Sequence, residues 1–253
     1  MHPDEIRELL EIKHEQYNKP DFILNDPIQV PHRFERREDI EIAAFLTTVI
    51  AWGTRTSIIR SANRIMELME WSPLEYLLQG DLNDYVRLRG FVHRTFNSRD
   101  LDFFFRSLRR IYLEAGGLEE VAARGYREGG TFGSLANIRK ELTVLHPGRS
   151  ARHIPDVMSG SAAKRLNLFL MWMVRNDHRG VHFGLWSRIS QAELRIPLDT
   201  HVGRVARMLG LLQRKSNDWK AVEELTAVLR GFDPADPCRY DFSLFGLGLF
   251  DHF

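Results

Sequence analysis

Apolar residues recur at helical spacing along almost the whole chain, and this periodicity restricts the fold more than any other feature. No segment alternates apolar and polar residues over the length of a strand with turn residues at both ends, so a sheet is not expected. We therefore expect an all-α protein, with Ile40–Ile50 as its most apolar and central helix. The other expected helices cover Ile6–Ile12, Ser57–Met69, Asp100–Leu113, Phe132–Leu145, Ala162–Val174, His201–Leu211, Trp219–Leu229 and Pro237–Leu247.

Helix-breaking residues indicate how the helices are grouped. The segment Asn18–Arg33 is rich in Pro and Asp and is expected to form an extended loop over the surface. Together with the first helix it makes an N-terminal part, residues 1–38, that packs on a main domain of residues 39–253. Gly129-Gly130 and Pro147-Gly148 place the boundary between two helical subdomains, which would flank a cleft, near residues 130–150.

The composition excludes several classes of protein. The single cysteine, Cys238, cannot form an intramolecular disulfide, a cysteine-ligated zinc site or a four-cysteine iron–sulfur cluster. The histidines show no metal-ligand spacing, so neither a metal nor another cofactor is expected. No apolar run reaches the roughly 20 residues needed to cross a bilayer, and the first residues lack an apolar signal core. We expect a cytoplasmic monomer that does not contact membranes.

Positive charge is concentrated in one part of the chain. The net charge is only +1, but the stretch from Arg139 to Lys215 contains 14 Lys and Arg against 5 Asp and Glu. Such asymmetry is typical of a surface that binds a polyanion. An equally good interpretation is that these cations are spread around helices as ordinary solvated residues.

One segment combines a turn of small residues with a lysine at the start of a helix. Ser159–Ala163 leads directly into an apolar helix, and a turn of this kind lets backbone N–H groups approach an anion closely. Lys164 falls in the first turn of that helix, where the helix dipole disfavours a cation. A phosphate partner or a reactive role would account for it, and so would an ordinary solvated lysine.

A second segment places a carboxylate at the start of a later helix. Asp199 precedes an amphipathic helix within Pro197-Leu198-Asp199-Thr200-His201-Val202-Gly203-Arg204-Val205 and is a good N-cap residue. The side chain would then sit at the mouth of the helix. Asp199 can be a helix cap without chemistry, and His201 is interpreted as structural.

Together these segments resemble the helix-hairpin-helix DNA glycosylases, of which endonuclease III is the best-known type. The similarity extends from the apolar helix that ends in Ala51-Trp52 to the final segment Tyr240-Asp241-Phe242-Ser243-Leu244-Phe245-Gly246. Lys164 and Asp199 are 35 positions apart, a spacing closer to the archaeal 8-oxoguanine DNA glycosylases. Asn25-Asp26-Pro27-Ile28 and Pro31-His32-Arg33-Phe34 also resemble a bacterial family without an assigned function.

The resemblance implies a DNA base-excision enzyme with Lys164 and Asp199 as its catalytic residues. Breaking the glycosidic bond passes through an oxocarbenium-like transition state, which the Asp199 carboxylate would stabilise. The neutral amine of Lys164 would attack C1′ and form a Schiff base, giving abasic-site lyase activity. A cation such as Arg165 favours the neutral amine, whereas Asp199 opposes it. The expected substrate is damaged, double-stranded DNA, with 8-oxoguanine as the candidate lesion.

The same resemblance suggests which residues contact DNA. The hairpin Gly160-Ser161-Ala162 would hold a phosphate, although Ala162 stands where relatives have a glycine and would oppose a positive φ. Trp52 would stack on a base or fill the gap that a base leaves, or it is simply core. The expected phosphate-binding cations are Arg149, Arg152, Arg165, Arg204 and Arg207.

Two other functions remain open at this point. The altered hairpin favours a nucleic-acid-binding protein that keeps the scaffold without catalysis. An all-α enzyme or interaction protein unrelated to DNA is the third possibility. Phe103-Phe104-Phe105 is interpreted as core rather than as a platform for bases.

Overall fold

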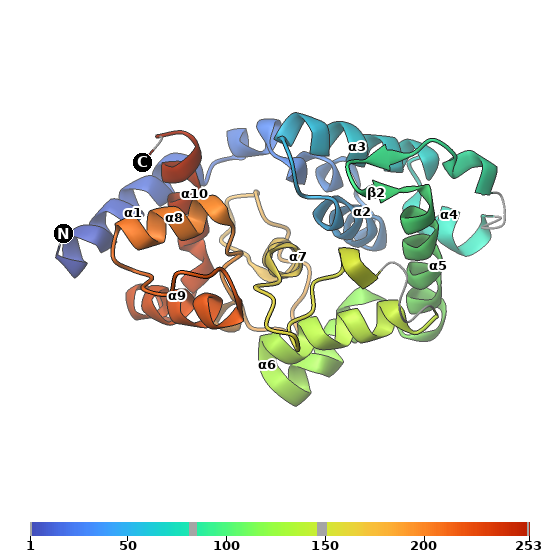
Figure 1. Ribbon diagram of the computed structural model, residues 1–253. Helices are drawn as coiled ribbons and strands as arrows, with labels where there is room; N and C mark the ends of the chain where they lie inside the picture. The colour runs from blue at the N-terminus through green and yellow to red at the C-terminus, as the bar shows by residue number, and fades with distance from the viewer. Residues whose placement is uncertain (1, 81–84, 146–150, 252) are drawn as a thin grey trace. The chain divides into compact units, whose positions relative to one another are not determined.

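The computed structural model describes residues 2–80, 85–145, 151–251 and 253. The described chain is mostly helical, which confirms the expected all-α class (Figure 1). Its α-helices are α1 Pro3–Tyr17, α2 Arg37–Val49, α3 Arg55–Leu68, α4 Pro73–Gln79, α5 Ser98–Glu114, α6 Leu118–Thr143, α7 Lys164–Val174, α8 Thr200–Met208, α9 Trp219–Phe232 and α10 Asp241–Leu249. Its 3-10 helices are η1 Pro20–Asn25, η2 Pro27–Gln29, η3 Pro31–Arg33, η4 Tyr85–Leu88, η5 Ala151–His153, η6 Gln191–Glu193 and η7 Pro237–Tyr240.

The chain divides into two compact units. One unit contains Met1–Phe22 and Pro155–Phe253, and the other contains Ile23–Ile154. Residues 1–38 are therefore divided between the two units, because α1 belongs with the C-terminal helices while η2 and η3 belong with α2 and α3.

The unit Ile23–Ile154 is built around α2. Ile42, Phe45 and Leu46 are at most 1% exposed, as expected for a central helix. The buried carboxylate of Glu41 in α2 accepts hydrogen bonds from Arg37 at 3.1 Å and from the hydroxyl of Tyr112 at 2.8 Å. A buried charge needs such partners. The hydrogen bond from Tyr112 of α5 to Glu41 also ties α2 to α5.

The segment Asn18–Arg33 is not the extended surface loop that its Pro and Asp content predicts. It winds through η1, η2 and η3, and Ile28 and Val30 are completely buried. Proline fixes φ near the helical value and opens each of these short helices, while the side chain of Asp26 accepts from the N–H of Ile28 at 3.0 Å. The expectation failed because the apolar residues are too few to show a period.

Helix α6 consists of two helical halves joined at Gly129-Gly130, where φ and ψ leave the helical range. The expected helix at Phe132–Leu145 matches the second half, and the first half was missed. A Cβ atom on Gly125 would lie 2.2 Å from the carbonyl oxygen of Gly133, so only glycine allows this close approach of the two halves. The hydroxyl of Ser134 donates to the carbonyl oxygen of Ala122 at 3.0 Å across the same contact.

Two further elements were not expected from the sequence. Helix α4 begins with Pro73, and the carboxylate of Asp39 in α2 accepts from the N–H of Leu74 at 2.7 Å. The two-residue strands β1 (Val92–His93) and β2 (Phe96–Asn97) pair as an antiparallel hairpin before α5. The described chain thus contains a minimal sheet that does not change its class.

The other unit packs α1, α8, α9 and α10 around a second core. Helix α10 contacts both α1 and α8, and the core brings together Leu10 of α1, Val205 of α8, Leu225 of α9 and Leu244 of α10. A Cβ atom on Gly246 would overlap the ring of Tyr17, at 2.2 Å from its Cδ2 atom. The absence of a side chain at that position lets α1 lie against α10.

A buried arginine joins α7 to this unit. Arg175, 1% exposed, follows the last residue of α7 and donates through Nε to both carboxylate oxygens of Asp236, at 3.1 and 2.9 Å. It also pairs with Asp177 at 2.9 Å and lies over the ring of Phe242. The charge of Arg175 is therefore compensated on two sides, and it links the end of α7 to the start of α10.

No helix in the described part of the chain combines the length and the apolar character that crossing a bilayer requires.

The environment of His14 predicts a pH-dependent stability. Burial, together with the nearby cations Arg239 and Arg175, lowers the pKa of His14 to about 4. The unfolded chain then binds a proton below about pH 6.5 that the folded chain does not accept until about pH 4. We expect the free energy of unfolding to fall by about 3 kcal/mol between these pH values, as chemical denaturation would measure.

The matched variant is His14→Gln, which lacks the titrating ring. Its stability at pH 7 should be lower than that of the natural protein, because Nδ1 of His14 pairs with the carbonyl oxygen of Arg239 at 2.9 Å. Its unfolding free energy should change less with pH between 6.5 and 4. Equal pH slopes for the two proteins would contradict the assignment to His14.

Candidate functional site

Helix α7 begins at Lys164, directly after a strained turn. Ala163 adopts the left-handed conformation, with φ 47° and ψ 37°, and Gly160 has φ 82°. Ala162 does not have a positive φ, and the alanine that adopts one is its neighbour Ala163. No side chain caps α7, so the first N–H groups of the helix are not covered by a capping group.

The hairpin before Lys164 is held from both sides. The carboxylate of Asp156 accepts from the N–H of Met158 and from the hydroxyl of Ser159, both at 3.0 Å. The carbonyl oxygen of Gly160 accepts from the N–H of Trp219 at 2.9 Å, which ties the hairpin to the start of α9. Residues 154–163 contain no helix, so the described hairpin is an irregular turn.

Asp199 and Lys164 meet at the starts of their two helices. Oδ1 of Asp199 accepts from the N–H of Val202 at 2.9 Å and thereby caps α8, as expected. Oδ2 of Asp199 lies 3.9 Å from Nζ of Lys164. The side chains are 21% and 29% exposed, respectively, so solvent reaches both groups. A separation of 3.9 Å is an ion pair without a tight hydrogen bond, which leaves the amine able to turn toward another partner.

Asn217, which the sequence did not single out, holds Asp199 in place, and Gly203 leaves the room that Asn217 needs. The side-chain amide of Asn217 donates to the carbonyl oxygen of Asp199 at 3.1 Å and accepts from Arg207 at 2.6 Å. A Cβ atom on Gly203 would lie 2.8 Å from Oδ1 of Asn217, so glycine is required for Asn217 to reach α8. The glycine within the first turns of α8 was the available signal, since glycine in a helix often marks a close approach.

The predicted cations of this unit differ in their surroundings. Burial lowers the pKa of Arg165 to about 10, which leaves it charged at neutral pH. Arg204 donates to the carbonyl oxygens of Gly248 and Phe253, and Arg207 donates to the carbonyl oxygen of Arg214. Within the described residues, neither Arg204 nor Arg207 pairs with a carboxylate, so both keep their charge available to an anion.

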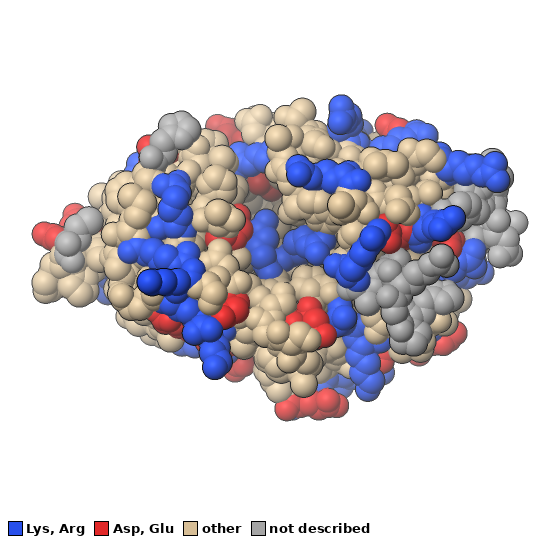
Figure 2. All heavy atoms as spheres, viewed as in Figure 1, with Lys and Arg blue, Asp and Glu red and all other residues tan. Residues whose placement is uncertain are grey.

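Lys and Arg side chains gather over α8 and the loop that follows it (Figure 2). Part of the basic stretch is nevertheless neutralised within the protein, because several of its arginines pair with acids. These pairs are Arg175 with Asp177 and Asp236, Arg179 with Glu15, Arg195 with Glu223, and Arg214 with Asp218. The arginines of α8 are therefore the better candidates for an anion site.

Trp52 belongs to the unit Ile23–Ile154, not to the unit that contains Lys164 and Asp199. Its ring stacks on that of His153 at 5.6 Å with an interplanar angle of 7°, and it meets the ring of His93 edge-on at 5.3 Å. Nε2 of His93 donates to the carbonyl oxygen of Trp52 at 3.0 Å. These contacts hold Trp52 in an aromatic cluster, but the residue is only half-buried, so it is not a core residue.

Arg152 and Phe103–Phe105, also predicted from the sequence, lie in the unit Ile23–Ile154. Arg152 donates to the carbonyl oxygen of Thr95 at 3.1 Å and to Asp100 at 3.3 Å, whereas Arg149 lies outside the described residues. Phe103–Phe105 are at most 4% exposed, which confirms their interpretation as core. Among the residues that the structure describes, no group of three or more His, Cys, Asp and Glu side chains could hold a metal ion.

The fold and the site together define an all-α protein with an amine and a carboxylate paired at two helix starts. Residues 26–250 match the model of the family described as "Protein of unknown function (DUF2400)", so the chain belongs to that family. Neither the curated proteins nor the solved structures contain a match to the chain.

The two roles of Asp199 can be separated by substitution. Asp199→Ala removes the cap of α8 and should lower the free energy of unfolding by about 1 kcal/mol. Asp199→Asn keeps an oxygen for the N–H of Val202 and should cost much less, because Asn and Asp cap helices about equally well. Urea denaturation of both variants measures the difference. Equal losses of stability would contradict the capping role.

Proposed function

We propose that the protein is a DNA glycosylase with abasic-site lyase activity, built on a helix-hairpin-helix scaffold. Lys164 is the nucleophile that forms the Schiff base, and Asp199 stabilises the transition state. The observation that carries the proposal is the 3.9 Å approach of Nζ of Lys164 to Oδ2 of Asp199. Two residues 35 positions apart, both partly exposed, supply the amine and the acid that this chemistry requires.

The proposed reaction assigns a different task to each group. As the bond between C1′ and the base nitrogen breaks, positive charge develops on the sugar, and the carboxylate of Asp199 stabilises it. The lone pair of the Lys164 amine forms a bond to C1′, and the departing base takes up a proton. The bond between C1′ and O4′ then breaks, O4′ takes up a proton that Nζ releases, and an imine forms between Nζ and C1′. In the lyase step C2′ loses a proton, a double bond forms between C2′ and C3′, and the C3′–O bond breaks to release the 3′ phosphate.

The arrangement around Lys164 supports a phosphate contact beside the reactive pair. The start of α7 carries no side-chain cap, and Gly160 provides an exposed turn without a side chain in front of it. Arg204 and Arg207 on α8 supply cations close in sequence to Asp199. A DNA backbone that follows these groups would bring a sugar to the amine, since phosphate contacts set the register of a bound strand.

The proposed substrate is damaged, double-stranded DNA, with 8-oxoguanine as the first lesion to test. This choice rests on the spacing of Lys164 and Asp199 and on the resemblance to the archaeal 8-oxoguanine glycosylases. A target base must leave the stack before either group can reach C1′, at a cost of a few kcal/mol.

Borohydride trapping tests the covalent step directly. Borohydride delivers hydride to the imine carbon and converts it to a stable secondary amine. We expect a covalent adduct between the protein and a duplex that carries 8-oxoguanine or an abasic site. Lys164→Ala should abolish the adduct. Asp199→Asn should slow base release by about a hundredfold or more, because it removes a charge at the transition state.

Lys220→Ala is the matched control, because Lys220 is exposed on α9 and plays no part in the site. It should trap as well as the natural protein. The absence of both adduct and base release on every lesion tested, with folded protein, would overturn the proposal. An adduct that still forms with Lys164→Ala would show that another residue is the nucleophile.

A non-catalytic nucleic-acid-binding protein on the same scaffold is the second candidate. The observation in its favour is that Asp199 caps α8 and Lys164 pairs with it, roles that require no chemistry. For this candidate, DNA binding weakens with salt, and each lost phosphate contact lowers the slope of log K against log salt by about one. Arg204→Gln or Arg207→Gln should lower that slope, as fluorescence anisotropy would measure.

Lys164→Ala separates the two candidates. A binding protein keeps its affinity apart from one phosphate contact and shows no turnover with any substrate. A glycosylase also keeps most of its affinity but loses turnover completely. DNA retention that does not depend on salt would contradict both candidates.

A further inference from the structure

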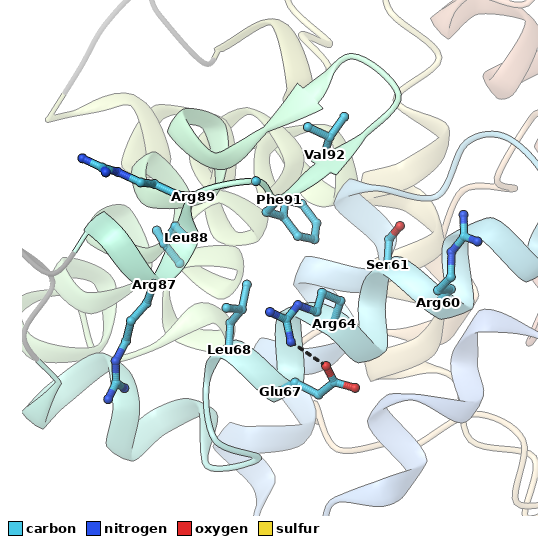
Figure 3. A pocket seen from close by; sticks show the side chains of 11 residues that line it. Arg60, Ser61, Arg64, Glu67, Leu68, Arg87, Leu88, Arg89, Phe91 and Val92 are labelled. Atoms are coloured by element: carbon cyan, nitrogen blue, oxygen red, sulfur yellow. Dashed lines mark hydrogen bonds and ion pairs between the residues drawn. The ribbon is translucent and has the colours of Figure 1, made fainter.

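The unit Ile23–Ile154 contains a basic pocket for which the proposed function gives no role. It has a volume of about 410 Å³ and lies between the second half of α3 and residues 87–92 (Figure 3). This volume is within the range of small-ligand sites. Four arginines line the pocket, Arg60, Arg64, Arg87 and Arg89, against a single acid, Glu67.

Arg64 lines this pocket with a side chain that is 60% exposed. Figure 3 shows its guanidinium beside the side chain of Leu68 and below the ring of Phe91, with Nη1 donating to Glu67 at 2.9 Å. A guanidinium has five N–H donors, and Glu67 occupies one nitrogen of the Arg64 group. Arg64 can therefore bind an anion while it keeps its ion pair.

The arginines at the edge add charge that is only partly compensated. Arg60, Arg87 and Arg89 stand around the pocket and point away from its centre (Figure 3). Arg87 pairs with Glu70 at 2.6 Å, whereas neither Arg60 nor Arg89 pairs with a carboxylate in the part of the chain that the structure describes. The flexible stem of Arg89 can turn inward, so that a phosphate beside Arg64 can meet a second guanidinium group, and Arg60 adds positive charge at the opposite side.

The floor of the pocket is apolar. Phe91 is 7% exposed and Leu88 is 4% exposed, and both are held from behind by the unit's core. The ring of Phe91 meets that of Phe96 edge-on at 6.1 Å, which fixes its orientation. A ligand with an apolar ring and an attached phosphate suits such a floor better than an inorganic ion, because the ring can lie against the apolar side chains.

Ser61 gives the pocket a group that accepts a hydrogen bond. Its hydroxyl oxygen lies 2.9 Å from Nδ1 of His93, and Nε2 of His93 donates to the carbonyl oxygen of Trp52. Because the carbonyl can only accept, the ring proton is on Nε2 and the hydroxyl of Ser61 donates to Nδ1. The oxygen of Ser61 is left to accept from a ligand hydroxyl or amine, a group that a sugar or a base supplies and a phosphate does not.

We infer that this pocket binds a nucleotide. The phosphate contacts Arg64 and an inward-turned Arg89, while Arg60 adds charge at the opposite side. The base lies against Leu68 and the small exposed part of Phe91, and a hydroxyl or amine of the ligand donates to Ser61. The same chemistry is offered by a free mononucleotide and by one residue of a nucleic-acid strand. The inference does not rest on Lys164 and Asp199, which belong to the other unit.

The test is isothermal titration calorimetry of the full chain with three probes: inorganic phosphate, AMP, and a single-stranded oligonucleotide. AMP should bind more tightly than inorganic phosphate, and its affinity should fall as salt is raised. Arg64→Gln and Arg89→Gln should each weaken AMP by about tenfold or more, since a hydrogen bond to a charged group is lost. If only the oligonucleotide binds, with the same two losses, the nucleotide belongs to a strand.

Arg99→Gln is the matched control, because Arg99 is exposed in the first turn of α5 of the same unit and makes no side-chain ion pair with the described residues. It should leave AMP affinity unchanged. Phe91→Leu keeps apolar volume but removes the ring, and it should weaken AMP while leaving phosphate unchanged. Thermal melts verify that each variant is folded.

Three results would overturn the inference. These are no binding of AMP or oligonucleotide by folded protein, equal affinity for AMP and phosphate, and an equal loss in Arg99→Gln and Arg64→Gln. Lys164→Ala separates this site from the proposed catalytic one. AMP affinity should persist in that variant whether or not the natural protein traps DNA, so the failure of one proposal does not imply the failure of the other.

Discussion

The buried guanidinium of Arg175 is the interaction on which the unit with the candidate site depends. It ends α7, and its bonds to Asp236 and Asp177 fix that end against the segment that begins α10. The hairpin fixes the opposite end of α7, through the bond between Trp219 and Gly160. With both ends held, α7 cannot slide or rotate freely, so the backbone of Lys164 keeps its place beside Asp199. Removing one partner from a buried ion pair typically costs about 3–5 kcal/mol, so this centre tolerates little change.

In the candidate site, the two oxygens of the Asp199 carboxylate make different contacts. One oxygen of Asp199 satisfies the start of α8, and the other faces the Lys164 amine. The cap sets the orientation of the carboxylate, and Asn217 restrains its backbone from the other side. The proposed glycosylase reaction would draw on this preorganisation, because groups that are already oriented need not reorganise to stabilise a transition state. It also explains why the amine and the acid can be close without a tight hydrogen bond.

The sequence predicted the parts of the molecule that have a period or a strong local signal. Long amphipathic helices such as α5 and α8 were recognisable from apolar spacing, and the capping role of Asp199 from residue type alone. The sequence could not predict that Asn18–Arg33 winds through three short 3-10 helices and buries Ile28 and Val30, because such short helices leave no period to detect. Asn217 was missed for a different reason: its role depends on a contact with Gly203 that only the packing of α8 against the next loop creates.

The division of the chain also determines the order in which its parts can be completed during synthesis. Helix α1 leaves the ribosome well before its packing partner α10, which is made only after the whole unit Ile23–Ile154. At about 5–20 residues per second, α1 waits roughly 10–50 s for the surface that buries Leu10. During this time its apolar face is open to chaperones, and the intervening unit can fold independently. A nascent chain stalled before α10 would therefore display a finished middle and an unprotected first helix.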